Sequence, residues 1–481
     1  MRSFEHCYID GEWVTPTGGR ALPRTCPVSE APSGQVLLAS AADVDRAVGA
    51  ARRAFAEMSG ASREQRLQWL RRLSALYAER KADLCAAVVA ELGCPMWLAE
   101  QAQVPLPGTH IDVAIDVLER YEFDLIHGST LIRKQPIGVC GLITPWNWPV
   151  SLAITKLVPA LAAGCSVVWK PSEFAPCSAQ VLGEIWAELG LPKGAFNLLL
   201  GEGREVGGAL SSHPDVDQIS ITGSTRAGVD VARQAAASVK RVHQELGGKS
   251  PNVVLDGADL AKVVESGVRY MFINSGQTCS APSRMIVPRA RLDEVLAIAM
   301  AVAESIEVGP PESGAFLGPL VNAAQWGRVQ DYIASGIAEG ARVVVGGPGR
   351  PEGLTQGYYV RPTIFADVTS QMRIVREEIF GPVLCIQTHE GVEDAVALAN
   401  DTPYGLAAFV HAASLSEARE VAVRLQAGQV CLNGDMDLLD PYAPFGGRRQ
   451  SGNGREWGAF GLESFLEEVA YLGYQPDTAE A

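Results

Sequence analysis

From about residue 137 onward, short apolar runs alternate with stretches of helical character, and this alternation constrains the fold more than any other feature. The apolar runs have the length of buried strands and occur at 137–143, 165–169, 196–200 and 218–221. The stretches with helical spacing occur at 151–162, 176–189 and 203–211. Because strands that alternate with helices build βαβ units, this region predicts a parallel sheet.

A second alternating series extends from 252 to 432 and predicts another α/β domain. Its β-rich runs occur at 253–255, 284–287, 342–345, 383–387 and 407–410. Segments 121–136 and 465–474 alternate apolar and polar residues outside both series, so they could pair as a small protruding sheet. A chain of 481 residues is too long for one core, so two or three domains are expected.

The N-terminal region predicts helices before the first series begins. Residues 43–58 carry apolar side chains at helical spacing, and a longer helix, or a broken pair, is expected from Ser62. Gln65 completes a possible capping box with Ser62, and Gly93 is a plausible helix end.

Composition excludes several classes of partner. The net charge is −15 and no basic stripe is evident, so nucleic acid and anionic membranes are poor partners. The ten cysteines form no CxxC pair and no zinc spacing, which indicates reduced thiols in a cytosolic protein with no metal site. The first six residues contain no apolar signal region, and the longest apolar stretch, 157–169, is too short to span a bilayer.

Cys279 and Glu245 supply a possible nucleophile and base. Cys279 lies in Asn274-Ser275-Gly276-Gln277-Thr278-Cys279-Ser280, and Glu245 opens Glu245-Leu246-Gly247-Gly248-Lys249, 34 residues upstream. A thiolate attacks carbonyl carbon, and a carboxylate activates a thiol or a water. Small neighbours would let a substrate and a cofactor ring approach the sulfur closely. Taken alone, the pair also fits a buried cysteine near an unrelated acid.

Glycine-rich segments of the first series indicate a phosphate site. Residues 201–207 have the spacing GxGxxxG, with Gly203 central, which fits a cofactor loop or a simple turn. Gly223 and Ser224 follow a strand-like run and open a helix, whose N-terminal N–H groups could receive a pyrophosphate. No Lys-Ser or Lys-Thr follows the last glycine, so a P-loop is excluded.

The run Lys170-Pro171-Ser172-Glu173 follows another strand and suggests the choice of cofactor. A carboxylate at Glu173 could hold two ribose hydroxyls and would repel a 2′-phosphate, and Lys170 could add a donor. This interpretation favours NAD over NADP. The alternative interpretation is that Lys170 and Glu173 lie in a solvated turn.

Together these residues resemble the aldehyde dehydrogenase superfamily over nearly the whole chain. The motifs occur in the family's order, from Ile9-Asp10-Gly11-Glu12-Trp13 to about Tyr471: Pro145-Trp146-Asn147-Trp148-Pro149, Lys170 to Glu173, Gly223-Ser224-Thr225, Glu245 to Lys249, Gly276 to Cys279, Glu377-Glu378-Ile379-Phe380-Gly381-Pro382, Pro444-Phe445-Gly446-Gly447, and Ser451 to Glu456. One departure is Arg449, where the family usually has lysine; the charge is retained.

The resemblance implies NAD(P)-dependent oxidation of an aldehyde to an acid and gives the residues their roles. It implies that Cys279 attacks the aldehyde, that Asn147 and the Cys279 N–H stabilise the oxyanion, and that Glu245 activates water. Lys156 and Glu456 resemble a proton relay. The cofactor residues implied by the motifs, together with the glycine signals, are Trp146, Lys170, Ser172, Glu173, Gly203, Gly223, Ser224, Gly247, Glu378 and Phe380. Relatives that transfer the acyl group to coenzyme A typically lack the glutamate, so water is the expected acceptor.

The substrate tunnel implied by the resemblance is mostly apolar or neutral. Its predicted residues are Trp148, Thr155, Ile273, Thr278, Leu439 and Phe445. None is an arginine that would clamp a short carboxylate, and the set lacks a full aromatic box for a quaternary ammonium group. A medium-chain aliphatic, ω-oxo or aromatic aldehyde remains.

The implied architecture is an α/β fold with a Rossmann-like NAD-binding domain, a second α/β catalytic domain and a small β oligomerisation arm. The expected bounds are 1–120 and 138–246 for the cofactor domain, 247–432 for the catalytic domain, 121–137 and 460–475 for the arm, and 433–459 for a segment that returns to the cofactor domain. A homodimer or homotetramer is expected. Alternatives are a thiol esterase or hydrolase, a dehydrogenase specific for a semialdehyde or betaine-type aldehyde, and a binding protein that retains the fold.

Overall fold

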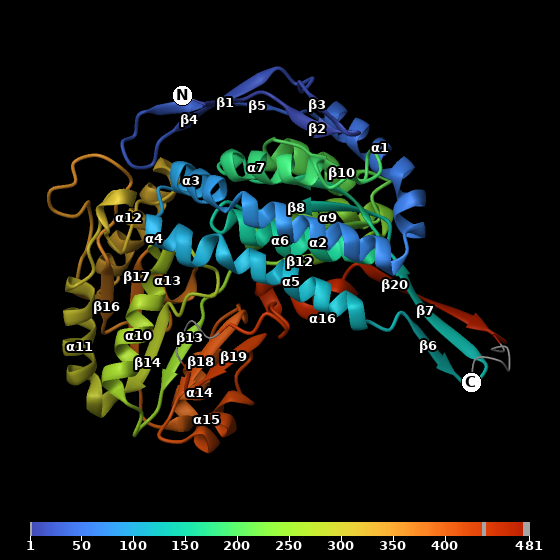
Figure 1. Ribbon diagram of the computed structural model, residues 1–481. Coiled ribbons are helices and arrows are strands. Elements are labelled where there is room, and N and C mark those ends of the chain that lie inside the picture. Colours follow the sequence, from blue (N-terminus) through green and yellow to red (C-terminus); the bar gives the residue numbers. More distant parts are fainter. Residues whose placement is uncertain (1, 435–438, 475–481) are drawn as a thin grey trace.

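The computed structural model describes residues 2–434 and 439–474, and its centre is formed by two seven-stranded sheets (Figure 1). In spatial order, the first sheet contains β12 (Arg241–Glu245), β11 (Gln218–Thr222), β8 (Val139–Ile143), β9 (Ser166–Lys170), β10 (Phe196–Leu198), β2 (Cys7–Ile9) and β3 (Glu12–Val14). The five strands from β12 to β10 are parallel, and β2 and β3 extend the edge antiparallel. The α/β class is therefore confirmed, with the predicted parallel sheet in this region.

The order of these strands creates a site for a ligand. The chain forms β8, β9 and β10 in one direction across the sheet and then returns to the other side of β8 with β11 and β12. The carboxyl ends of β8 and β11 therefore lie at a topological switch point, where open α/β sheets bind their ligands.

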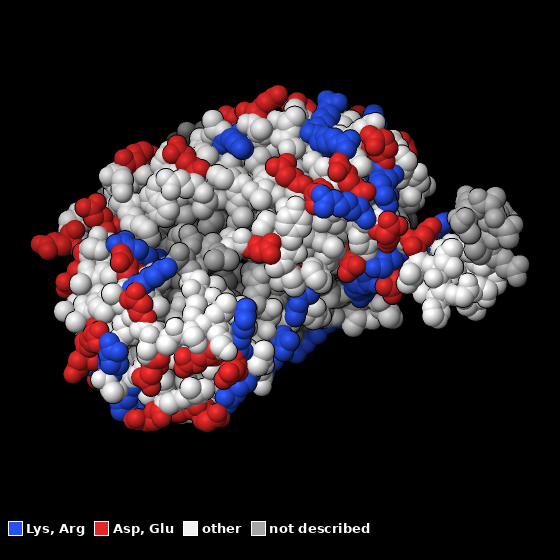
Figure 2. All heavy atoms as spheres, turned by 60° about the horizontal axis from the view of Figure 1, so that its bottom comes forward, with Lys and Arg blue, Asp and Glu red and all other residues white. Residues whose placement is uncertain are grey.

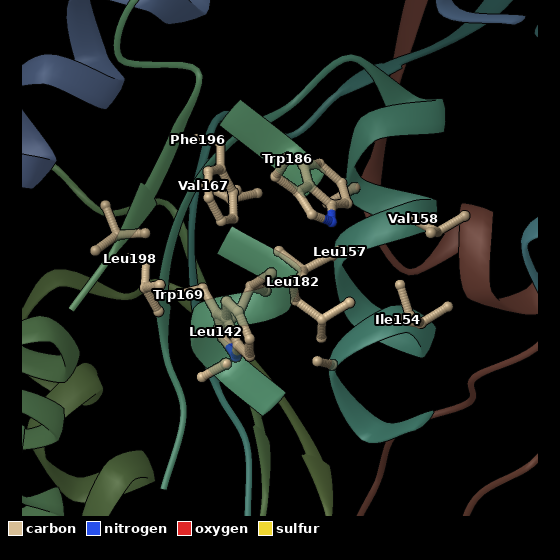
Figure 3. Packing of buried hydrophobic residues seen from close by; sticks show 14 of the residues in the cluster. Leu142, Ile154, Leu157, Val158, Val167, Trp169, Leu182, Trp186, Phe196 and Leu198 are labelled. Carbon is tan, nitrogen blue, oxygen red and sulfur yellow. The ribbon is translucent and has the colours of Figure 1, made fainter. Parts of the chain in front are cut away.

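Helices cover this sheet and bury its apolar side chains. They are α1 (Ala41–Gly60), α2 (Arg63–Glu79), α3 (Lys81–Leu92), α4 (Met96–Leu98), α5 (Pro105–Arg120), α6 (Pro149–Ala163), α7 (Pro176–Ala187), α8 (Gly208–Ser212) and α9 (Thr225–Ala235). Figure 3 shows Trp186 of α7 over Phe196 of β10, with ring centroids 5.1 Å apart. Trp169 and Leu157 lie in the same fully buried cluster. Burying each such side chain contributes about 1.5–3 kcal/mol or more, which fixes the sheet on which the site is built.

The helix expected from Ser62 is a broken pair, one of the two expected alternatives, because Arg80 leaves helical geometry between α2 and α3. The first region differs from the sequence expectations at two places. The stretch 203–211 begins as a π-helical turn (Gly203–Gly207) before α8. Strand β12 was not predicted, since its inward side chains, His243 and Glu245, are polar and give no apolar alternation.

The expected helix ends are largely present. Ser62 Oγ accepts a hydrogen bond from the Gln65 N–H at 3.2 Å, as an N-cap does, and Gly93 ends α3 in the left-handed conformation.

The second sheet has the order β15 (Arg342–Val345), β16 (Thr363–Ala366), β17 (Val383–His389), β14 (Arg284–Pro288), β13 (Pro251–Val254), β18 (Ala407–His411) and β19 (Gln429–Leu432). Only the β15–β16 pair is antiparallel. Its helices are α10 (Leu260–Phe272), α11 (Leu292–Glu304), α12 (Ala323–Ala338), α13 (Arg373–Arg376), α14 (Val392–Asn400) and α15 (Leu415–Ala422). The predicted second α/β region is thus present, while β16 and β19 had no counterpart among the predicted runs.

Two smaller sheets complete the fold. The arm contains β20 (Leu466–Leu472), β7 (Thr130–Pro136) and β6 (Asp124–His127) in that order, all antiparallel, and Figure 1 shows it projecting from the body. The predicted pairing of these two distant segments is confirmed. Near the N-terminus, β1 (Arg2–Phe4), β5 (Pro32–Leu38) and β4 (Arg20–Thr25) form a further sheet, and α16 (Gly458–Glu463) precedes β20.

Domain bounds stay predictions. Residues 435–438 of the segment 433–459, and residue 475 at the end of the arm, lie outside the described residues. Acidic and basic side chains are interspersed over most of the face shown in Figure 2. Among the described helices, none combines the length and apolarity needed to cross a bilayer.

Candidate active site

The loop after β8 brings Asn147 to the switch point. Pro149 is the first residue of α6, where its fixed φ suits a helix start. Asn147 is 3% exposed, and its Nδ2 donates to the carbonyl oxygen of Gln277 at 2.9 Å. A carboxamide nitrogen carries two hydrogens. The second hydrogen of Asn147 therefore stays available for a ligand oxygen, as far as the described residues show.

Cys279 follows a strained turn. Asn274 and Ser275 adopt left-handed conformations with φ of 53° and 55°, and Gly276 follows with φ of 72°. Such angles are costly for residues with a Cβ and persist only when the surroundings impose them. A Cβ on Gly276 would lie 2.2 Å from the carbonyl oxygen of Gly381, so this position requires glycine. The tightly packed turn fixes the direction in which the thiol points.

Gly247 and Gly248 bring the main chain against two functional groups. A Cβ on Gly247 would lie 2.2 Å from Glu378 Oε2, and a Cβ on Gly248 would lie 2.6 Å from the carbonyl oxygen of Cys279. The Gly248 N–H also donates to Glu378 Oε1 at 3.1 Å. Burial raises the pKa of Glu378 to about 7. The two glycines are therefore needed for close approach, which the sequence motif alone did not reveal.

A cavity of about 180 Å³ opens at the switch point and contains Cys279. The predicted site residues that line it are Trp146, Asn147, Gly223, Ser224, Gly247, Cys279, Glu378 and Phe380. They come from the ends of β8 and β11, the loop after β12, the turn after α10 and the loop before β17. The structure thus brings a thiol, an amide donor and six of the ten expected cofactor residues into one space.

The thiol of Cys279 is protonated at neutral pH in this arrangement. Burial, with the nearby carboxylates of Glu378 and Glu245, raises the pKa of Cys279 to about 12. A thiolate therefore requires a positive charge near the sulfur, or the loss of a negative one.

Glu245 lies beside this cavity, next to its lining residue Leu246. Its side chain is 2% exposed, and neither carboxyl oxygen has a hydrogen-bond partner among the described residues. A Cβ on Gly446 or Gly454 would lie within 2.8 Å of Glu245 Oε1. The carboxyl group therefore packs directly against the main chain of these two glycines. Burial and then the charge of Glu456 raise the pKa of Glu245 well above its ordinary value. A carboxyl group whose pKa is raised in this way takes a proton more readily than an exposed carboxylate does.

A buried ion pair lies close to Glu245. Lys156 Nζ of α6 contacts Glu456 Oε1, and both side chains are almost completely buried. Thr155 Oγ1 donates to Glu456 Oε2 at 3.1 Å, and Lys156 Nζ donates to Ser220 Oγ at 3.1 Å. The predicted relay residues are thus in contact with each other, and Thr155 lies with them.

The remaining cofactor residues lie at the carboxyl end of β9 and beyond β10. Lys170 Nζ is 3.2 Å from Glu173 Oε2, so the two predicted ribose contacts pair with each other. Ser172 is buried, and its Oγ accepts from the Phe174 N–H at 3.2 Å. Gly203 begins the π-helical turn and has open space at its Cβ position.

The arrangement fits a dinucleotide. Ser224 caps α9, and its Oγ accepts from the Ala227 N–H at 3.2 Å, which leaves its hydroxyl hydrogen for a phosphate. Gly223 beside it meets nothing closer than 3.8 Å at its Cβ position. The predicted phosphate position therefore lies in the same cavity as Cys279. In the described residues, no group of three metal-ligating side chains occurs.

A second, larger cavity of about 410 Å³ begins beside Ser280, the neighbour of Cys279. The predicted tunnel residues Leu439 and Phe445 line it. The others do not: Trp148 Nε1 donates to Thr278 Oγ1 at 3.1 Å, Ile273 packs on the main core, and Thr155 binds Glu456. Those four residues are not among the lining of this cavity.

Several lining residues were not found from the sequence. Tyr270, Phe409 and Cys431 line the larger cavity, and the rings of Tyr270 and Phe409 meet edge to face at 5.9 Å. Gln325 and Arg328 of α12 line the smaller cavity, where they donate to the carbonyl oxygens of Phe380 and Glu378, both at 2.7 Å. No local motif marks these residues, because their place depends on how distant elements pack.

Comparisons with known proteins identify the same family that the residues of this site indicate. The model of the aldehyde dehydrogenase family matches residues 13–470. A 3-succinoylsemialdehyde-pyridine dehydrogenase from a Pseudomonas species is 49% identical, over 99% of this chain and 100% of its own. A cysteine variant of aldehyde dehydrogenase C from Pseudomonas syringae, in complex with NAD⁺ and octanal, is 52% identical with a TM-score of 0.96, over 98% of this chain and 97% of its own. The Mycobacterium tuberculosis aldehyde dehydrogenase in complex with NAD⁺ is 38% identical with a TM-score of 0.94, over 98% of each chain.

Proposed function

The chain belongs to the aldehyde dehydrogenase family, and from that premise we propose that it oxidises an aldehyde to a carboxylic acid, with NAD as hydride acceptor and water as acyl acceptor. One observation carries the proposal. Cys279, Asn147 and six of the ten residues expected to hold the cofactor line one cavity at the switch point of a parallel sheet. A hydrolase that needs no cofactor would have no use for the phosphate position at Ser224 or for the Glu378–Phe380 loop beside the thiol.

Cys279 is the proposed nucleophile. Its sulfur attacks the aldehyde carbon and forms a thiohemiacetal, whose oxyanion accepts hydrogen bonds from Asn147 Nδ2 and the Cys279 N–H. The second hydrogen of the Asn147 amide supports this role, because the first is held by the carbonyl of Gln277.

The cofactor-binding residues hold NAD beside this sulfur. When bound, NAD supplies the hydride acceptor and, in its oxidised form, a positive charge that favours the thiolate. Ser224 and the N-terminus of α9 receive the pyrophosphate, Glu378 binds the nicotinamide ribose, and the edge-to-face contact of Trp146 with Phe380, at 5.5 Å, shapes the ring pocket. Glu173 binds the adenosine ribose, which favours NAD over NADP.

Glu245 is the proposed general base for hydrolysis of the thioester. It removes a proton from water as the oxygen attacks the acyl carbon, and the carbon–sulfur bond then breaks. The raised pKa of Glu245 and its lack of hydrogen-bond partners support a group that exchanges protons with water. Lys156 and Glu456 carry the proton away.

The proposed substrate is an aldehyde with an uncharged aromatic or medium-chain alkyl tail. The larger cavity is lined mainly by apolar groups, with Tyr270, Phe409 and Phe445 supplying aromatic surface. Asp440 is the one charged residue among its described lining, so an anionic tail has no cationic partner there. The octanal complex and the pyridine semialdehyde enzyme among the relatives agree with this class.

The arm is the proposed oligomerisation surface. Leu125, Ile126 and Leu472 are 62%, 49% and 82% exposed on its two outer strands, β6 and β20. Unpaired edge strands with apolar side chains favour association with another chain. We assign the enzyme to the cytoplasm as a homodimer or homotetramer, with domain bounds as predicted from the sequence.

The test is a panel of aldehydes incubated with NAD, in which the absorbance of reduced cofactor is followed. Neutral aryl and medium-chain alkyl aldehydes should give the highest kcat/KM, and a short carboxylate-bearing semialdehyde should give a lower value. If no aldehyde produces reduced cofactor while simple esters are hydrolysed, the esterase alternative replaces the proposal.

A further inference from the structure

Phe445 connects the lining of the larger cavity with the segment that carries Glu456. It lines this cavity together with its neighbours Ala443 and Pro444. The Phe445 N–H donates to the carbonyl oxygen of Glu456 at 3.0 Å, and the Glu456 N–H donates to the carbonyl oxygen of Phe445 at 2.7 Å. The two residues therefore form a short antiparallel bridge. These hydrogen bonds fix the main chain of Phe445 and leave the direction of its ring to side-chain packing.

The side chain that packs on the ring of Phe445 belongs to Trp457. The two rings are stacked, with centroids 4.7 Å apart and an angle of 23° between their planes. Trp457 also contacts the ring of His110, a buried residue of α5, at a centroid distance of 4.9 Å. Trp457 is not among the described lining of either cavity, and the proposed function gives it no role.

The main chain at Trp457 is strained. Its φ of 72° and ψ of 154° lie in a region that is essentially restricted to glycine. Along an extended chain, side chains alternate between two faces, so an unstrained residue 457 would point away from the face that Glu456 shares with Phe445. The unusual angles interrupt this alternation, and the Trp457 ring reaches Phe445. Such strain persists only where the surrounding structure imposes it.

Close contacts on either side hold this strained segment in place. Trp457 precedes α16 as its N-cap residue. A Cβ on Gly458 would lie 2.5 Å from the carbonyl oxygen of Tyr442, so the chain after Trp457 packs tightly on the segment that leads to Phe445. Tyr442 Oη in turn donates to Asp116 Oδ2 of α5 at 3.2 Å. The Trp457 ring is therefore a fixed support for the ring of Phe445.

We infer that Trp457 is a positioning residue for substrate specificity: its ring holds Phe445 against the aldehyde tail and so determines how tightly the larger cavity binds long alkyl tails. The inference rests on the proposed function, in which the larger cavity receives that tail. One methylene group in an apolar pocket changes kcat/KM by about 10–200-fold, so a small displacement of one lining ring has a measurable effect. The single methyl group of acetaldehyde covers too little of the lining to depend on this support.

The experiment measures kcat and KM for octanal and for acetaldehyde at saturating NAD. The variants are Trp457→Leu, which removes the flat ring, and Trp457→Phe, which keeps one. The matched control is Trp97→Leu. Trp97 is also partly buried and stacked, on Phe316 with ring centroids 5.1 Å apart, and it is not among the described lining of either cavity.

In Trp457→Leu, KM for octanal should rise about tenfold while kcat stays within about twofold, because contacts with the tail stabilise the bound substrate and the transition state equally. For acetaldehyde both constants should stay within about twofold, so the preference for octanal should fall about tenfold. Trp457→Phe should restore most of the preference, and Trp97→Leu should leave it unchanged.

A double-mutant cycle tests whether Trp457 acts through Phe445. Phe445→Ala should itself lower the preference for octanal, and Trp457→Leu added to it should change the preference by less than about twofold further. If the two losses multiply instead, Trp457 acts independently of Phe445 and the inference is wrong.

An unchanged preference for octanal in Trp457→Leu would overturn the inference. An equal fall of kcat for both aldehydes would also overturn it, because Trp457 would then act on the neighbouring Glu456 and not on the tail. If Trp457→Leu fails to fold, Trp457→Gly decides the question, since glycine adopts these backbone angles without strain and should show the same loss of preference. Failure of the proposed function is distinguishable, because the unmodified protein would then form no reduced cofactor from any aldehyde.

Discussion

Around Cys279 the main chain of glycines packs closely against functional groups, whereas around Glu245, beside the active-site cavity, buried polar and ionisable side chains pack against one another. The first region, here the thiol wall, consists of Gly247, Gly248, Gly276 and Cys279, and at its glycines an added Cβ would lie 2.2–2.6 Å from another atom. The second region, here the acid–base wall, consists of Lys156, Ser220, His243, Glu245 and Glu456, all almost completely buried.

The difference shows two ways of holding reactive groups in place. The thiol wall depends on the absence of side chains, so the position of the sulfur is set by close contact and tolerates no extra atom. The acid–base wall depends on charge and hydrogen-bond direction, so a substitution of the same shape can leave the structure intact and still change the chemistry. Substitutions in the two walls should therefore fail in different ways.

The largest effect is expected when the reactive atom of the thiol wall is removed. Cys279→Ala should lower dehydrogenase and esterase turnover by more than about 10⁴-fold, because no other group can form the thioester. NAD binding, measured by calorimetry, should persist. Cys26→Ala, a partly exposed cysteine outside both cavities, is the control. Near-normal turnover of Cys279→Ala would show that Cys279 is not the nucleophile and would contradict the proposed mechanism.

The next effect tests the acid–base wall with a substitution of equal shape. Glu245→Gln should slow thioester hydrolysis by about 10²–10³-fold while the first turnover still forms NADH, so a burst followed by slow turnover is expected. If the burst disappears as well, Glu245 acts earlier, as the base that activates Cys279.

The pH dependence of the unmodified enzyme follows from the same residue. Glu245 works as a base only when ionised, and burial raises its pKa well above the ordinary value. Deacylation should therefore rise with pH over a range above that of an ordinary carboxyl group and fall as the pH drops through the raised pKa. Stopped-flow measurement of product release from pH 4 to pH 9 checks this; a rate already at its maximum at pH 5 would contradict the raised pKa.

A smaller effect is expected from one added methyl group in the thiol wall. In Gly248→Ala the new Cβ would lie 2.6 Å from the Cys279 carbonyl oxygen, so the turn must shift. Turnover should fall about 10²-fold, as expected for a displacement of roughly 1 Å at a reactive group, with about 1–3 kcal/mol of lost stability. Gly49→Ala in α1, whose Cβ would meet only Arg53 at 3.7 Å, should leave both unchanged. If Gly248→Ala and Gly49→Ala lost the same amount of turnover and stability, close main-chain contact would not be what holds the thiol in position.

The smallest effect concerns cofactor choice at the far end of the site. NAD should exceed NADP in kcat/KM by at least about tenfold, which needs about 1.4 kcal/mol, because the Glu173 carboxylate repels a 2′-phosphate. Lys170, 3.2 Å from Glu173, offsets part of this repulsion, so a preference is expected and not a block. Glu173→Gln should narrow the gap by removing the charge. Equal use of both cofactors by the unmodified enzyme would show that Lys170 dominates.

Much of the fold could be predicted because its signals are local. The apolar runs that became β8, β9 and β11 are continuous, and Ser62 and Gly93 mark helix ends by their own chemistry. Strand β12 was missed for a physical reason. Its buried residues, His243 and Glu245, are polar, so hydropathy could not reveal a strand that faces an acid–base cluster.

The sequence by itself determined the family and the α/β class, and it predicts the reactive residues, since ordered motifs around Cys279, Glu245 and Asn147 carry that information in a few adjacent letters. Only the tertiary structure decided which groups meet. It brought Ser220 opposite His243, placed Thr155 in contact with Glu456, and put Tyr270 and Phe409 into the lining of the larger cavity. Contacts between residues that are 23 to 301 positions apart depend on strand order and helix packing, and no local pattern of residues encodes those distances.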